Sequence, residues 1–221
     1  MHCRPLLALP LLFAAAPALA EDDAHVWTAV VAQGPVSKDG LLVFFDGWAR
    51  IGAEPGRFRQ YIFRPAIGAK LNKTTSVFTG YAYVRTGDAD DLVTEQRFWQ
   101  QIGWQAVHRP GLKITGRSRI EQRFIGGSDE VALRFRQQVR ADVPIDTERK
   151  ITAVVWTEPF INLNGPGRMR TGIDRWRSFA GINVPVTKTL SLEPGYLNQY
   201  VRRRGDDIVN HVAAMSFVAR W

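Results

Sequence analysis

The sequence predicts an all-β protein, a single antiparallel transmembrane β-barrel of 10–12 strands with an arginine- and glutamate-rich interior. Three observations predict it. The chain begins with an export signal. Long segments then alternate between apolar and polar side chains at every second residue, which is the period of a β-strand. No segment after residue 20 stays apolar for the ~20 residues that a membrane-spanning helix needs.

Residues 1–20 resemble a secretory signal peptide. Arg4 gives a basic start, an apolar run covers residues 6–13, and Ala18-Leu19-Ala20 forms a small-residue cleavage site before Glu21. We therefore expect cleavage near Ala20, a β-barrel domain over residues 21–221, and localisation in the bacterial outer membrane.

Composition excludes several classes of protein. The only cysteine, Cys3, lies within the expected signal, so the mature chain has no disulfide framework and no thiolate zinc site. The formal net charge is +8, but the arginines are spaced along alternating segments and not gathered in a tail or on a helix face. We therefore expect no nucleic-acid partner.

Eleven segments have the alternation of strands. In chain order they are 25–34, 40–51, 57–71, 74–86, 92–107, 111–125, 130–145, 149–160, 173–186, 188–202 and 208–221. Glycine, proline, asparagine and aspartate separate most of them, for example at 109–111, 126–129 and 164–167. Many are long enough to cross a bilayer when tilted, since ~12–14 residues at about 3.4 Å each span roughly 30 Å at 45°. Bacterial single-chain barrels have an even number of strands, so we expect ten or twelve. Either one segment near the N-terminus is peripheral or residues 161–170 hide another strand.

Several segments carry one ionic face. The clearest is 112–124, where the odd positions include Lys113, Arg117, Arg119, Glu121 and Arg123 and the even positions are mostly apolar. An arginine at the lipid midplane costs about 2–4 kcal/mol, whereas an arginine in the lumen is hydrated or paired. We therefore expect the ionic faces to share one lumen, with a network formed by Glu95, Arg97, Arg117, Arg119, Glu121, Arg123, Arg134, Arg136, Arg140, Asp142, Glu158, Arg175, Arg177 and Glu193.

The last segment is apolar and ends on an aromatic residue. Phe217 and Trp221 resemble the C-terminal signal by which outer-membrane barrels are recognised for assembly. We expect the barrel-assembly machinery, outer-membrane lipids and lipopolysaccharide as partners. The oligomeric state does not follow from the sequence.

Three short motifs carry a family resemblance. They are Phe98-Trp99-Gln100-Gln101, then Ser118-Arg119-Ile120-Glu121-Gln122-Arg123-Phe124, and then Gly195-Tyr196-Leu197-Asn198-Gln199-Tyr200 followed by Asn210-His211. In their order and spacing the chain resembles the uncharacterised bacterial family DUF2490. The resemblance implies an outer-membrane-type barrel of unknown activity, with an interior and an aromatic girdle defined by Trp99, Gln100, Gln101, Arg117, Arg119, Glu121, Arg123, Tyr196, Asn198 and Gln199.

The expected lumen network contains nine arginines and five acidic residues. Ten to twelve strands enclose little space beyond their own side chains, so the simplest expectation is a structural barrel filled by Arg/Glu pairs. The arginine excess adds a porin-like hypothesis, a narrow anion-preferring channel.

Two other classes stay open. One is a soluble periplasmic β-barrel that binds an acidic or lipid-like ligand, in which the apolar faces would point inward. The other is an outer-membrane lipid hydrolase, for which His211 is the residue to test. We expect no enzyme, no catalytic residue, no cofactor and no metal.

Overall fold

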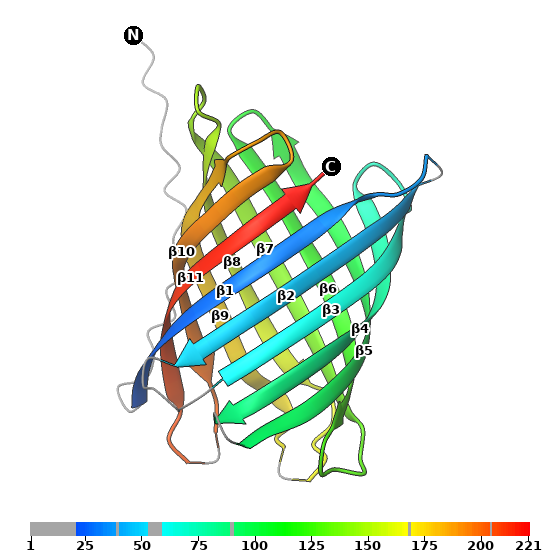
Figure 1. The fold of residues 1–221 in the computed structure, drawn as a ribbon, viewed down its shortest axis with the longest axis vertical. Coiled ribbons are helices and arrows are strands. Elements are labelled where there is room, and N and C mark those ends of the chain that lie inside the picture. The colour runs from blue at the N-terminus through cyan, green and yellow to red at the C-terminus, as the bar shows by residue number, and fades with distance from the viewer. Residues whose placement is uncertain (1–20, 39, 53–58, 89–90, 168, 204) are drawn as a thin grey trace.

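The computed structural model describes residues 21–38, 40–52, 59–88, 91–167, 169–203 and 205–221, which form one closed β-sheet (Figure 1). Its strands are β1 (Glu21–Pro35), β2 (Leu41–Gly52), β3 (Arg59–Lys70), β4 (Thr75–Asp88), β5 (Asp91–Arg109), β6 (Leu112–Ile125), β7 (Ala132–Asp146), β8 (Ile151–Asn162), β9 (Gly172–Pro185), β10 (Leu190–Val201) and β11 (Ile208–Arg220). Each of the eleven expected segments coincides with one strand to within a few residues. The expected signal peptide, residues 1–20, lies outside the described residues.

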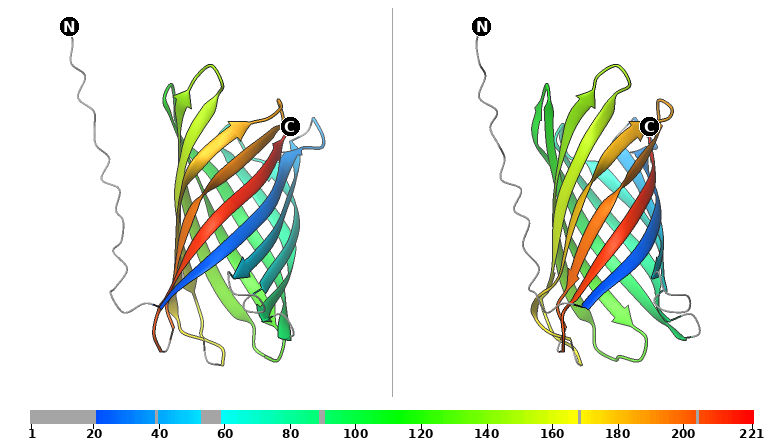
Figure 2. Two further views of the ribbon diagram at one scale, coloured as in Figure 1. Left: turned by 60° about the vertical axis from the view of Figure 1, so that its left-hand side comes forward. Right: turned by 90° about the vertical axis from the view of Figure 1, so that its left-hand side faces the viewer.

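The first and last strands close the barrel. β1 and β11 run in parallel, with Glu21 opposite Ile208 and Gln33 opposite Arg220, and they lie side by side in both views of Figure 2. All other neighbouring strands are antiparallel. An odd number of strands leaves the first and last pointing the same way, and a parallel ladder pairs their backbone groups.

The expectation of an even strand number is therefore wrong. No strand of the described residues is peripheral, because β1 pairs with both β11 and β2. Between β8, which ends at Asn162, and β9, which begins at Gly172, the described residues form no further strand. The even-number rule assumed that only antiparallel pairs close a barrel.

The outer wall of the barrel is apolar. Large exposed apolar side chains occur on every strand except β8, and include Val30, Ile51, Phe63, Ile67, Tyr83, Phe98, Ile102, Phe124, Val139, Ile182, Tyr196 and Phe217. Their sequence neighbours point inward and are buried, as Arg97 is beside Phe98 and Arg123 is beside Phe124. The ionic faces therefore lie inside and the apolar faces outside.

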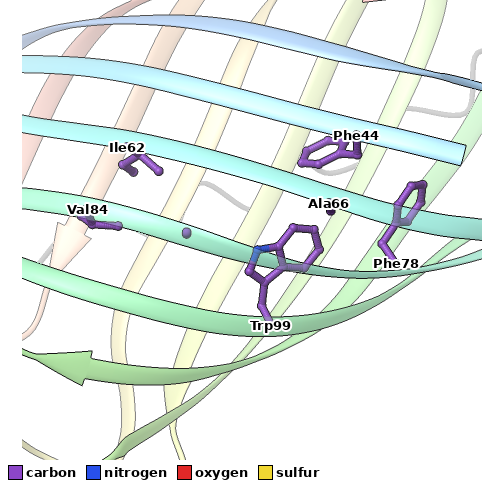
Figure 3. Close-up of a cluster of buried hydrophobic side chains, with 7 residues drawn as sticks. Phe44, Ile62, Ala66, Phe78, Val84 and Trp99 are labelled. Carbon is purple, nitrogen blue, oxygen red and sulfur yellow. The ribbon is translucent and has the colours of Figure 1, made fainter.

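The interior is not purely ionic. Figure 3 shows an apolar cluster inside β2–β5, where Phe44, Phe78 and Trp99 pack together. The ring centroid of Phe44 is 5.9 Å from that of Trp99 and 6.0 Å from that of Phe78. A second cluster around Trp27 and Phe179 covers the inner face of β1 and β8–β11. These aromatic residues occupy the lumen and do not belong to an outer girdle.

No helix in the described part of the chain is both long and apolar enough to cross a bilayer.

Candidate functional site

Arg136 on β7 lies at the centre of the interior network. Its Nη1 donates to Glu121 on β6 at 2.8 Å, and its Nη2 donates to both carboxylate oxygens of Glu158 on β8 at 2.9 Å. Arg117 also donates to Glu158, at 3.1 Å. The side chains of Glu121 and Glu158 are 0% and 2% exposed. Because both carboxylates are cut off from water, the arginines that surround them supply their hydrogen bonds.

Glu95 on β5 forms a second centre of the network. It accepts two hydrogen bonds from Arg97, at 2.7 and 2.9 Å, and two from Arg123 on the neighbouring strand β6. Arg97 also lies 3.7 Å from Glu121, which links the two centres. Bidentate pairs of this kind fix the planes of both partners.

Two further groups complete the pairing. Arg140 donates to Asp142 at 2.7 Å and to Glu193, across the lumen on β10, at 2.7 and 2.9 Å. Arg134 donates to Asn162 and, at 2.9 Å, to Asp174.

All fourteen residues expected in the lumen network lie on the inner face, and most are brought together in these groups. Arg175 and Arg177 are exceptions. Within the described ranges, neither has a carboxylate oxygen within 4.0 Å, the limit for an ion pair. Arg177 donates instead to the amide oxygen of Gln199, at 2.8 Å.

Sequence reasoning missed several interior groups. Asp46 and Arg64 form a buried ion pair at 3.1 Å between β2 and β3, and Arg50 donates to Gln60 at 2.7 Å. All four residues occupy even positions of neighbouring strands, so the alternation itself could have found them. They went unnoticed because Phe44, Ile62 and Trp48 share that face and make it look apolar.

Aromatic rings cover the buried guanidinium groups. The Cζ atom of Arg119 lies 4.1 Å from the ring centroid of Trp99, and that of Arg136 lies 4.3 Å from the centroid of Phe160. The electron-rich ring faces stabilise cations that are removed from water. The ion pairs and rings together fill the middle of the lumen, where Trp27, Trp99, Arg119, Glu121 and Glu158 are each at most 1% exposed.

A cavity of about 580 Å³ lies above this closed layer, and we call it the basic chamber. Its lining includes Trp221 and residues of the β1–β2 and β3–β4 ends, so it lies at the end of the barrel where the chain ends (Figure 1). Among the described residues its lining has four acidic side chains (Asp46, Asp142, Glu158 and Glu193) and ten basic ones (Arg50, Arg64, Lys70, Lys73, Lys113, Arg117, Arg136, Arg140, Arg177 and Arg220). This surplus of positive charge in a recess with low-dielectric walls attracts and concentrates anions.

The family motifs are divided between the two faces of the wall. Trp99, Gln101, Arg119 and Gln199 are buried inside. Outside, Gln100 accepts a hydrogen bond from Gln122, while Tyr196 is 45% exposed and contacts Asn198.

His211 lies on the outer wall. Its Nδ1 is 2.7 Å from the hydroxyl oxygen of Tyr196 on the adjacent strand β10. Within the described ranges, no group of three or more His, Cys, Asp or Glu side chains is placed to hold a metal ion.

The chain is similar to several known proteins. The chain is 34% identical over 227 residues to an uncharacterized protein of Methylorubrum extorquens, covering 100% of this chain and 99% of the relative. LpxR from Salmonella typhimurium has a similar structure with a TM-score of 0.49 and 7% identity, covering 80% of this chain and 83% of that one. The NanC porin also has a TM-score of 0.49, with 12% identity over 82% of this chain and 85% of that one. The family model for DUF2490, a protein family of unknown function, matches residues 24–210, so the chain belongs to the DUF2490 family.

Proposed function

We propose that this protein is an outer-membrane β-barrel, closed at mid-lumen in its resting state, that takes up small anions into the basic chamber. The observation that carries the proposal is the sorting of side chains. Ionic groups line the lumen with a surplus of positive charge, while the outer wall exposes large apolar side chains on ten of the eleven strands. A soluble barrel would leave these apolar groups in water, whereas lipid accepts them at no cost.

Membrane fractionation and gel migration test the membrane part of the proposal. We expect recovery in the outer-membrane fraction and faster migration of the unboiled protein, because a folded barrel survives detergent. Recovery in the soluble periplasmic fraction would contradict the proposal and favour a soluble ligand-binding barrel.

A narrow anion-preferring channel is the second candidate. The surplus of arginine in the lumen favours it, since a path that opened through this layer would be lined by cations. Planar-bilayer recordings in a KCl gradient separate the two candidates. The closed barrel predicts no steady current, and the channel predicts small currents whose reversal potential shows anion preference. A large porin-like conductance or a preference for cations would contradict both.

We also propose that the protein is not an enzyme. His211 has a tyrosine hydroxyl beside it on the outer wall, and this pair supports an interfacial position on the barrel. Incubation of the purified barrel with phospholipid or lipid A tests this proposal. Hydrolysis that stops in His211→Ala would overturn it and establish the lipid hydrolase.

Partners follow from the same proposal. The exposed apolar wall would contact outer-membrane lipids and lipopolysaccharide. Phe217 is 41% exposed on that wall and Trp221 lies just beyond the end of β11, which is consistent with a terminal signal read by the barrel-assembly machinery.

A further inference from the structure

Arg50 and Arg177 are arginines of the basic chamber that form no ion pair with the described acidic residues. Arg50 on β2 and Arg177 on β9 both line the chamber and are each 5% exposed. Within the described ranges each is hydrogen-bonded only to a glutamine, Arg50 to Gln60 at 2.7 Å and Arg177 to Gln199 at 2.8 Å. An amide holds a guanidinium in place without neutralising it. The positive charge of both groups is therefore available to a ligand.

Both guanidinium groups are held in position before any ligand binds. Their Cζ atoms lie 4.3 Å (Arg50) and 4.9 Å (Arg177) from the ring centroid of the buried Trp27. Each glutamine partner is itself oriented by another hydrogen bond: Gln60 donates to Thr86, and Gln199 donates to Asn210, both at 2.7 Å. A ligand therefore loses little free energy in ordering these side chains.

The terminal nitrogens of these arginines remain accessible. Three of these nitrogens donate no hydrogen bond to the described residues: both Nη atoms of Arg177 and the Nη2 of Arg50. They are not fully buried, whereas the Nε of Arg50 is buried and has no hydrogen-bond partner. Both residues line the chamber. Guanidinium donors in this arrangement match the planar oxygens of a carboxylate or phosphate.

An aromatic wall lies beside the two arginines. Trp156 and Phe179 stack with centroids 5.3 Å apart and an interplanar angle of 13°, and both line the chamber. Trp48 lines it as well and lies 4.6 Å from the guanidinium of Arg50. A purely inorganic anion would make no apolar contact with this wall. The volume of about 580 Å³ falls within the range of pockets for small organic molecules.

We propose that the floor of the basic chamber is a binding site for an organic anion. Its carboxylate or phosphate group accepts hydrogen bonds from Arg50 and Arg177, and its apolar or aromatic body packs against Trp48 and Trp156. The inference rests on the proposed function in one respect, which is that the chamber admits anions from solution.

Binding of benzoate to the full-length mature barrel in detergent tests the site. Calorimetry with wild type should show benzoate binding, weaker binding of acetate, and no binding of benzyl alcohol, which has the ring without the charge. Arg50→Gln and Arg177→Gln should each weaken benzoate binding about tenfold or more, because each removes a charge-assisted hydrogen bond.

Arg175→Gln is the matched control. Arg175 also faces the lumen and has no carboxylate within ion-pair distance among the described residues, but it does not line the chamber. Its variant should bind benzoate within about twofold of wild type, a change too small to represent a lost hydrogen bond. The heat-dependent gel shift shows that each variant is folded.

Arg177→Lys is the second variant to test if a glutamine variant does not fold. It keeps the positive charge but loses the planar guanidinium, so it should bind benzoate with an affinity between those of wild type and Arg177→Gln.

The outcomes separate this site from the proposed function. A folded outer-membrane barrel that binds no benzoate, or binds it equally in wild type, Arg50→Gln and Arg177→Gln, would overturn the site and leave the membrane barrel standing. Equal affinity for acetate and benzoate would overturn the role of the aromatic wall. Recovery of the protein in the soluble fraction would instead overturn the proposed function.

Discussion

Arg136 and its two carboxylates show how single residues hold this interior closed. A buried charge is tolerated only while its partners remain, because water does not reach it. Glu158 receives hydrogen bonds from Arg136 and Arg117, and its side chain is 2% exposed. Loss of this carboxylate takes one of two ion-pair partners from the buried Arg136 and the ion-pair partner from the partly exposed Arg117.

We predict that Glu158→Gln lowers the free energy of unfolding by about 3–5 kcal/mol, the range for breaking a buried ion pair. Urea unfolding in detergent, followed by tryptophan fluorescence, measures it. Glu148→Gln is the control, since Glu148 lies in the exposed β7–β8 turn, and it should leave stability unchanged. Equal stability of the two variants would show that Glu158 is hydrated.

Asp207 provides a test of pH dependence outside the strands. A hydrogen bond from the hydroxyl of Tyr200 and another from the backbone N–H of Arg203 hold the pKa of Asp207 below its ordinary value. Its contribution to the order of the β10–β11 loop is therefore complete above the unfolded-state pKa of about 3.9 and is lost as the pH falls through the lower folded-state pKa.

We predict that NMR titration of the Asp207 carboxyl carbon gives a midpoint below about 3.9. Tyr200→Phe should raise this midpoint, because it removes the larger of the two contributions. A wild-type midpoint at or above the ordinary value, or one that Tyr200→Phe leaves unmoved, would contradict the observed hydrogen bonds.

At the residue scale the sequence predicted a network of arginines and acidic residues in the lumen, but it did not identify every residue of that network. Alternation is strongest where one face is almost entirely ionic, as on β6 and β7, and those residues were identified. It is weak where arginine and aromatic residues share the inner face, as on β2, so Arg50 and Asp46 were missed. Which carboxylate pairs with which arginine depends on the register between neighbouring strands. Side-chain alternation within one strand does not predict that register.

At the scale of elements, small residues let the interior aromatics pack. A Cβ on Gly80 of β4 would lie 2.6 Å from a ring carbon of Trp99 and 2.5 Å from the backbone oxygen of Pro65. Such contacts force the neighbouring strand or the indole to move. A side chain at this position is therefore incompatible with the packing of β3–β5.

We predict that Gly80→Ala destabilises the barrel by about 1–3 kcal/mol, the usual cost of overpacking a core. Gly205→Ala is the matched control, because a Cβ at Gly205 has no heavy atom within 4 Å. The temperature at which unboiled protein loses its fast gel migration measures the effect. If both variants lose it at the same temperature, Trp99 does not pack on β4 as described.

The seam between β1 and β11 is the element that sequence reasoning did not find. All eleven strand positions followed from alternation, yet the rule that bacterial barrels have even strand numbers led to the expectation of ten or twelve. Parallel and antiparallel neighbours use the same side-chain period, so alternation does not distinguish them. At the end of this seam, the indole N–H of Trp221 donates to the backbone oxygen of Pro35 at 3.1 Å.

At the scale of the whole molecule, the fold places charge inside and apolar surface outside. We expect this outer wall to contact lipid and the basic chamber to contain water. The chain suits a direct test, because its only cysteine, Cys3, lies in the expected signal. A single cysteine introduced into the mature protein then carries one spin label.

The measurement is electron paramagnetic resonance of Ile102→Cys and Ser216→Cys labels in lipid bilayers. Ile102 is 50% exposed on the outer wall, and Ser216 lines the chamber. We predict that the label at 102 collides mainly with oxygen, which partitions into lipid, and that the label at 216 collides mainly with a water-soluble nickel chelate. A label at 102 that meets the nickel chelate as readily as the label at 216 would contradict the account, because the apolar wall would then face water.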